Sequence, residues 1–66
     1  MDLSILRVVR KNKNISLIEL SIMVGINRNR LGMIERGIVV PRLDLLEKIC
    51  DVLGLELRLL IKTEKE

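Results

Sequence analysis

The side chains best suited to recognise another molecule lie between positions 28 and 36 of this 66-residue chain. Successive helical residues turn by about 100°, so four of them share one face within about 140°: Arg28, Asn29, Gly32 and Met33. Arginine can donate two hydrogen bonds to O6 and N7 of guanine, and asparagine can pair similarly with adenine. Methionine can touch the methyl group of thymine. The spacing therefore predicts a helix face whose side chains have the chemistry to pair with the base edges of duplex DNA.

Each of these positions also has an interpretation that needs no ligand. Arg28 and Asn29 could form a solvated helix start, and Met33 could fill an edge of the core, as methionine often does. Gly32 costs roughly 1 kcal/mol in a helix interior. Close approach to DNA would explain that glycine, and so would neutral drift.

Residues 16–37 have the pattern of two short helices joined by a tight turn. Ser16 followed by Glu19 predicts a capping box at the start of the first helix. Gly25 suits the left-handed position that ends it. Asn27 can cap the second helix, and Gly37 ends it. Two short helices with a glycine in the turn predict a helix-turn-helix.

The rest of the chain adds further helix patterns. Apolar residues recur at three- and four-residue spacing before and after residues 16–37. Pro41 blocks any helix through the loop 38–41, and Asn14 suits a left-handed helix end. The expected helices span 2–13, 17–24, 28–36 and 43–53. The predicted fold class is all-α, with a DNA-binding domain over residues 1–54.

Beyond Gly54 the apolar residues recur at every second position instead of every third or fourth. Four apolar residues alternate with their neighbours: Leu55, Leu57, Leu59 and Ile61. This alternation predicts a short β-strand over 55–62, and a fifth helix is the competing interpretation. A lone strand needs a partner, so we expect it to pair across a homodimer, with these four residues in the interface and 63–66 as a frayed end.

The charge of the chain is unevenly distributed. From Arg7 to Arg42 there are eight Lys/Arg and two acidic residues, whereas the rest has four basic and seven acidic residues. A basic segment that coincides with a helix-turn-helix is typical of phosphate contact, although a small domain can also solvate itself with arginines. The expected phosphate contacts are Ser16, Leu17, Arg30, Arg36, Arg42, Lys11 and Lys13. Leu17 would contribute its backbone N–H at the helix start.

Size and cysteine content limit how the fold can be stabilised. Below roughly 70–80 residues one core rarely gives more than about 3–5 kcal/mol. One cysteine excludes a disulfide within the chain, and one cysteine without histidine makes zinc unfavourable. We therefore expect no metal and no cofactor, and self-association instead. Cys50 falls on the apolar side of its helix, which favours a buried core thiol over a redox role.

Several function classes are disfavoured. The chain has no histidine, no nucleophile beside a base and no clustered carboxylates, so it is not expected to be an enzyme. No apolar run approaches the roughly 18 residues of a membrane span, and no signal peptide is evident. We expect a cytoplasmic protein, held at the nucleoid through DNA. The absence of Phe, Trp and Tyr argues against RNA as a partner.

From about Leu3 to Leu55 the chain resembles the lambda-repressor-like (Cro/C1-type, Xre) family of DNA-binding domains. The motifs that carry the resemblance are Arg10, Ser16, Leu20-Ser21, Gly25-Ile26-Asn27, Ile34-Glu35-Arg36-Gly37, Pro41, Leu46-Glu47-Lys48-Ile49 and Leu53-Gly54. The resemblance implies a buried ion pair between Arg10 and Glu35. It also implies base contacts at outward positions near the start of the second helix of the motif, which here are Arg28, Asn29, Gly32 and Met33. The tail resembles the C-terminal strand of HipB-like antitoxins, a branch of this family.

Two departures from the family pattern stand out. The family usually has glutamine after the Ser/Thr cap, where it helps to fix the helix on DNA, and here that residue is Leu17. The loop before Pro41 is usually polar, and here it contains Val39 and Val40. These valines suggest a surface for a partner or for a second copy.

Two functions follow as hypotheses. The first is a homodimeric, sequence-specific transcriptional regulator of double-stranded DNA, most simply a repressor of its own operon that binds a near-palindromic operator. The alternative is an antitoxin or scaffold whose main role is to bind a protein partner such as a toxin. The basic segment favours the first hypothesis, whereas Leu17 and the apolar loop favour the second.

Overall fold

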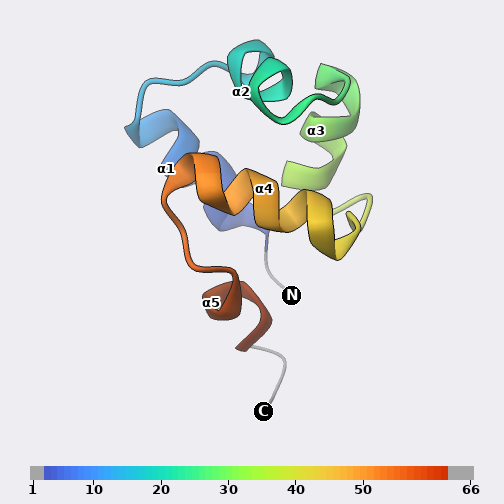
Figure 1. Ribbon diagram of the computed structural model, residues 1–66. Helices are drawn as coiled ribbons and strands as arrows, with labels where there is room; N and C mark the ends of the chain where they lie inside the picture. The colour runs from blue at the N-terminus through green and yellow to red at the C-terminus, as the bar shows by residue number, and fades with distance from the viewer. Residues whose placement is uncertain (1–2, 63–66) are drawn as a thin grey trace.

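The computed structural model describes residues 3–62, and within that range helices joined by turns and loops make up the fold, with no strand (Figure 1). The helices are α1 (Ser4–Asn12), α2 (Leu17–Val24), α3 (Arg28–Glu35), α4 (Leu43–Leu53) and α5 (Leu57–Lys62). The first four confirm the predicted helices to within one or two residues at each described end. Asp2, predicted as the first helical residue, and the predicted frayed end 63–66 lie outside the described residues.

Local hydrogen bonds set the ends of α2 and α3. The backbone N–H of Glu19 donates to Ser16 Oγ at 3.0 Å, and the N–H of Ser16 donates to Glu19 Oε1 at 2.8 Å. This is the predicted capping box. Gly25 ends α2 with a φ of 78°, which only glycine adopts without strain. Asn27 then caps α3, because its Oδ1 accepts the N–H of Asn29 at 2.6 Å. The tight turn places α3 against α2.

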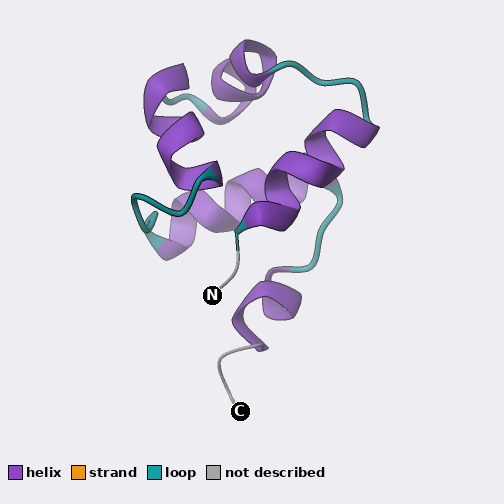
Figure 2. Cartoon of the chain, turned by 180° about the vertical axis from the view of Figure 1, so that it is seen from behind, coloured by secondary structure: helices purple, strands orange, loops and turns teal. Residues whose placement is uncertain are grey.

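One core receives side chains from all of the first four helices. Its largest fully buried members are Leu6, Leu20, Leu31, Ile34, Leu46, Ile49, Leu53 and Cys50. Helix α2 packs on α3 and α4, and α1 packs on the same two helices. Seen from behind, α1 and α4 support the α2–α3 pair, while α5 lies apart from that pair, toward the C-terminal end (Figure 2). The orientation of α3 is therefore set by the whole core.

The environment of Cys50 agrees with the predicted core thiol. Its side chain is buried, and it forms no disulfide. Burial raises the pKa of the Cys50 thiol above its ordinary value, and the negative charge of Asp51 adds to the effect. A protonated, buried thiol is a poor nucleophile.

The predicted strand over residues 55–62 is wrong, because Leu57–Lys62 form the helix α5. Gly54 ends α4 in a left-handed conformation, and the N–H of Leu55 donates to the carbonyl of Cys50 at 2.8 Å. The chain can then turn back, so that Leu60 enters the core at 6% exposure. Leu57 and Leu60 are three residues apart, which places them on one face of a helix but on opposite faces of a strand.

The helix also removes the reason for pairing through this segment. A helix satisfies its backbone hydrogen bonds within itself, whereas a lone strand needs a partner. Leu55 and Leu57, expected at a dimer interface, are half-buried against the core of their own chain. The side chains of Leu59 and Ile61 lie outside the described residues. The structure therefore gives no support to a strand that pairs across a homodimer. The likeness to HipB-like antitoxins depended on that strand and loses its support as well.

Candidate nucleic-acid interface

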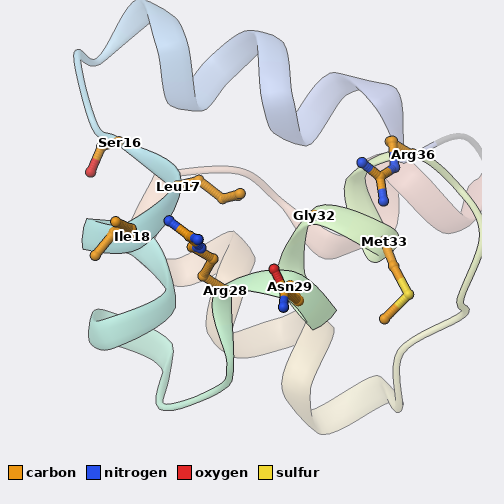
Figure 3. A pocket seen from close by; sticks show the side chains of 8 residues that line it. All are labelled: Ser16, Leu17, Ile18, Arg28, Asn29, Gly32, Met33 and Arg36. Atoms are coloured by element: carbon orange, nitrogen blue, oxygen red, sulfur yellow. The ribbon is translucent and has the colours of Figure 1, made fainter.

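An open groove of about 520 Å³ lies between helices α2 and α3 and is called the α2–α3 groove below (Figure 3). Its walls are the start of α2 and the outward face of α3 with the residue that follows it. The lining residues are Ser16, Leu17, Ile18, Arg28, Asn29, Gly32, Met33 and Arg36. All four residues predicted to contact bases therefore lie together. Ser16, Leu17 and Arg36, predicted to contact phosphates, line the same groove.

Apart from Ser16, which caps α2, the polar side chains of this groove are not engaged elsewhere. Arg28, Asn29 and Arg36 are exposed, and among residues 3–62 their side chains hold no hydrogen bond or ion pair. The backbone N–H of Asn29 is used by the Asn27 cap, which leaves the side-chain amide of Asn29 unused. Of the described residues that line the groove, none is acidic. The groove thus offers free donors in a positive environment.

Gly32 lies opposite Leu17 across the floor of the groove (Figure 3). A Cβ atom at position 32 would lie 3.5 Å from Leu17 Cδ2, an ordinary van der Waals contact. The backbone of Gly32 is helical and its φ is not positive. Neither packing nor conformation therefore requires glycine here, which leaves close approach of a ligand and neutral drift as the two explanations.

A smaller groove of about 250 Å³ lies beside the first, between α1 and α3. This α1–α3 groove is lined by Arg7, Arg10, Lys11, Leu17, Gly32, Glu35 and Arg36. It brings the predicted phosphate contacts Lys11 and Arg36 together, and it adds Arg7, which the sequence analysis missed. Arg7 and Lys11 are four residues apart on α1, and this spacing was the available signal. The two grooves share Leu17, Gly32 and Arg36, so the basic side chains of Arg7, Lys11 and Arg36 extend the positive lining of the α2–α3 groove toward α1.

Arg10 and Glu35 form the buried ion pair that the family resemblance implied. Arg10 Nε lies 2.8 Å from Glu35 Oε2, and Nη2 donates to Oε1 at 3.1 Å. Arg10 Nη1 also donates to the carbonyl of Ile15 at 2.9 Å. One guanidinium therefore joins α1, the α1–α2 turn and the end of α3. The pair fixes the start of α2 relative to α3, and so the shape of both grooves.

The remaining predicted phosphate contacts lie outside both grooves. Arg30 and Arg42 are exposed, and Arg42 precedes the first residue of α4. Lys13 has a structural explanation, because its Nζ lies 3.9 Å from where a Cβ of Gly54 would be. A cation beside the C-terminus of a helix, here α4, is favoured by the helix dipole. Contacts of Arg30, Arg42 and Lys13 with phosphate stay predictions.

The part of the chain that the structure describes contains neither a membrane-spanning helix nor a metal-binding cluster. Within residues 3–62, no helix has the length and apolar character needed to cross a membrane. In the same range, no group of three or more Cys, Asp or Glu side chains is arranged to hold a metal ion.

The helix-turn-helix family model matches residues 6–60 of this chain. The match begins within α1 and ends within α5, so it includes the ion pair and every residue that lines either groove. Comparison with curated proteins and with solved structures gives no match. The chain belongs to the helix-turn-helix family of lambda-repressor and Xre-like DNA-binding domains.

Proposed function

We propose that this protein is a sequence-specific transcriptional repressor that acts as a homodimer on a near-palindromic operator. The family membership carries the coarser part, DNA binding and transcription regulation. The observation that supports sequence specificity is the α2–α3 groove, where the free side chains of Arg28 and Asn29 lie on the outward face of α3.

Helix α3 enters the major groove with its first turn facing the bases. Arg28 is suited to guanine, through O6 and N7, and Asn29 is suited to adenine, through N6 and N7. Both side chains are exposed at the N-terminal end of α3 and have no partner among the described residues. Each such bidentate contact discriminates against a wrong base by about 1–3 kcal/mol.

The basic side chains around the two grooves bind the phosphates on either side of the major groove and so fix how deeply α3 enters it. Arg36 lines both grooves, and Arg7 and Lys11 line the α1–α3 groove. Contacts with phosphate fix the register and orientation of a protein on the duplex without carrying sequence information. The backbone N–H of Leu17, at the start of α2, supplies one more donor to phosphate.

The loop between α3 and α4 supplies the seam of the proposed dimer. Three large apolar side chains are exposed to solvent here: Ile38 and Val40 in the loop, with Val40 at 76%, and Leu43 as the first residue of α4. Val39 is half-buried against the core and so has a structural explanation. To bind two half-sites, a dimer joined through this loop must hold its two α3 helices about one DNA turn apart, roughly 34 Å.

The dimer is tested by the mass of the protein in solution. Val40→Glu places a charge on the seam without touching the core, so we expect a monomer that keeps the helical circular-dichroism spectrum of the wild type but unfolds at a lower temperature, because the contribution of association is lost. Val8→Glu, which alters an exposed apolar residue of α1 at 52% exposure, is the matched control and should stay dimeric. Dimeric masses for both variants and the wild type would place the seam elsewhere, and a monomeric wild type would overturn the proposed dimer.

The DNA-binding proposal is tested by selection from a random duplex library. A selected sequence should bind far more tightly than a scrambled one, and its affinity should fall steeply with salt, because neutralised phosphates release counterions. If no duplex is selected, or if binding is independent of salt, the protein-binding alternative replaces this proposal.

A further inference from the structure

We propose that the α2–α3 groove recognises thymine through its 5-methyl group, using an apolar patch made by Leu17, Ile18 and Met33. This inference rests on the proposed function, because it assumes that α3 lies in the major groove. It deepens that function by naming a base that the hydrogen-bonding side chains alone do not select.

The patch lies beside the two base-contacting side chains. Leu17 and Ile18 begin α2, Met33 comes from α3, and all three line the same groove as Arg28 and Asn29 (Figure 3). Ile18 is 48% exposed, and Leu17 and Met33 are half-buried. Their carbon atoms therefore remain open to a ligand that enters the groove.

Gly32 makes the centre of this patch accessible. Leu17 Cδ2 lies 3.5 Å from where a Cβ of residue 32 would be, and no side chain fills that space. Figure 3 shows the Leu17 side chain directed across the groove toward Gly32. A small apolar group that approaches the α3 backbone there can contact Leu17 directly.

The chemistry of the major groove identifies that group. Among the four base pairs, the 5-methyl of thymine is the one apolar group on a major-groove base edge. Asn29, in the same groove, is suited to adenine, the partner of thymine. A half-site with an A·T pair under Asn29 would thus present a methyl group within the reach of this patch.

The charge of the groove argues for DNA as the occupant. Arg28 and Arg36 flank the patch, and the described lining residues include no acid. A polyanion that carries isolated methyl groups matches this combination of free cations and a small apolar surface. An apolar protein segment would leave the two arginines unpaired in the interface, which is costly.

Base analogues test the proposal without changing the protein. The selected operator is prepared with uracil in place of each thymine in turn, which deletes one methyl group, and affinity is measured by fluorescence anisotropy. At one or two positions of each half-site we expect uracil to weaken binding about three- to fivefold, the value of one buried methyl.

A second pair of duplexes separates thymine from methylated cytosine. At the sensitive position, 5-methylcytosine should bind more tightly than cytosine, since it restores the methyl group, but less tightly than thymine, since the adenine partner is lost. Tighter binding of 5-methylcytosine than of thymine would overturn the assignment to thymine.

Variants connect the effect to the patch. In Ile18→Ala and Met33→Ala the ratio of thymine to uracil affinities should fall toward one. Ile22→Ala, one turn further along α2, is the matched control, because Ile22 is 73% exposed and does not line the groove. It should keep the wild-type ratio.

Two failures have different meanings. If a selected operator binds specifically but uracil is tolerated at every position, this inference is wrong and the proposed function stands. If no duplex is selected at all, the proposed function fails, and the thymine contact fails with it.

Discussion

The two ion pairs of the described structure join the same kinds of side chain in opposite surroundings. Arg10 and Glu35 lie 2.8 Å apart, with side chains 8% and 3% exposed. Arg58 and Glu56 lie 3.0 Å apart, with side chains 82% and 62% exposed. The first pair connects two helices that are distant in the sequence, whereas the second connects residues two positions apart. Distance alone therefore says little about what an ion pair does.

Whether an arginine is buried or exposed, and whether it has an acidic partner, decides its role in this protein. Water screens the exposed pair, which makes its contribution small. The buried pair cannot be broken without leaving a desolvated charge, so it acts as a geometric constraint on α1 and α3. Arg28 and Arg36 have no acidic partner among the described residues. An arginine that is paired inside the fold positions the groove, and an unpaired one is available to a ligand.

The largest expected effect comes from breaking the buried pair on one side. Glu35→Gln should lower the free energy of unfolding by about 3–5 kcal/mol, because the Arg10 charge stays buried without its carboxylate. That equals most of the stability a core of this size supplies, so the variant should be largely unfolded at 25 °C. The helical circular-dichroism signal of the variant at 25 °C without denaturant, compared with the urea transition of the wild type, measures the change.

Two further variants show whether charge burial is the cause. Glu47→Gln, at an exposed position of α4, is the matched control and should change stability by less than about 0.5 kcal/mol. The double variant Arg10→Met with Glu35→Leu should recover much of the loss, since apolar replacement of a whole pair is often neutral. A Glu35→Gln protein as stable as the wild type would contradict this account of the pair.

The next effect compares the two free arginines. Arg28→Ala should weaken operator binding by about 1–3 kcal/mol and relax the preference at one base position. Arg36→Ala should weaken selected and random duplexes alike and reduce the salt dependence by about one counterion, because a phosphate contact carries no sequence information. Anisotropy titrations at two salt concentrations measure both effects. Identical behaviour of the two variants would remove the distinction between base and phosphate contacts.

The helix-turn-helix could be predicted from the sequence because its ends depend on local hydrogen bonds. Ser16 and Glu19 are three residues apart, and Asn27 caps a helix that starts at the next position. The groove residues follow from helical spacing once those ends are known. Arg10 and Glu35 needed the family resemblance, since no local rule joins residues so far apart in the chain.

The C-terminal segment could not be predicted in the same way. Its apolar residues fit a period of two, but Leu57 and Leu60 also fit one face of a helix. The burial of Leu60 against the core decides between them, and that contact is tertiary. Ile18 was missed for a similar reason, because its place in the groove depends on how α2 lies against α3. A truncation before residue 55 would take Leu60 from the core, so it would change the stability of the fold as well as any contact between copies.

A smaller effect distinguishes the two explanations of Gly32. Gly32→Ala should raise the free energy of unfolding by up to about 1 kcal/mol, because alanine is the better helix former and its Cβ meets Leu17 at an ordinary distance. If DNA approaches the α3 backbone closely, the same variant should bind the operator more weakly. A variant that is more stable and binds equally well would favour neutral drift.

The smallest effect belongs to the exposed pair, and it completes the contrast with Arg10 and Glu35. Arg58→Ala should change the free energy of unfolding by no more than about 0.5 kcal/mol, because solvent and salt screen Arg58 from Glu56. What change there is should shrink between low and physiological salt concentrations, because added salt screens an exposed pair. A loss above about 1 kcal/mol that persists at high salt would show that Arg58 stabilises α5 by something other than a screened pair, and the screening argument would then fail for this helix.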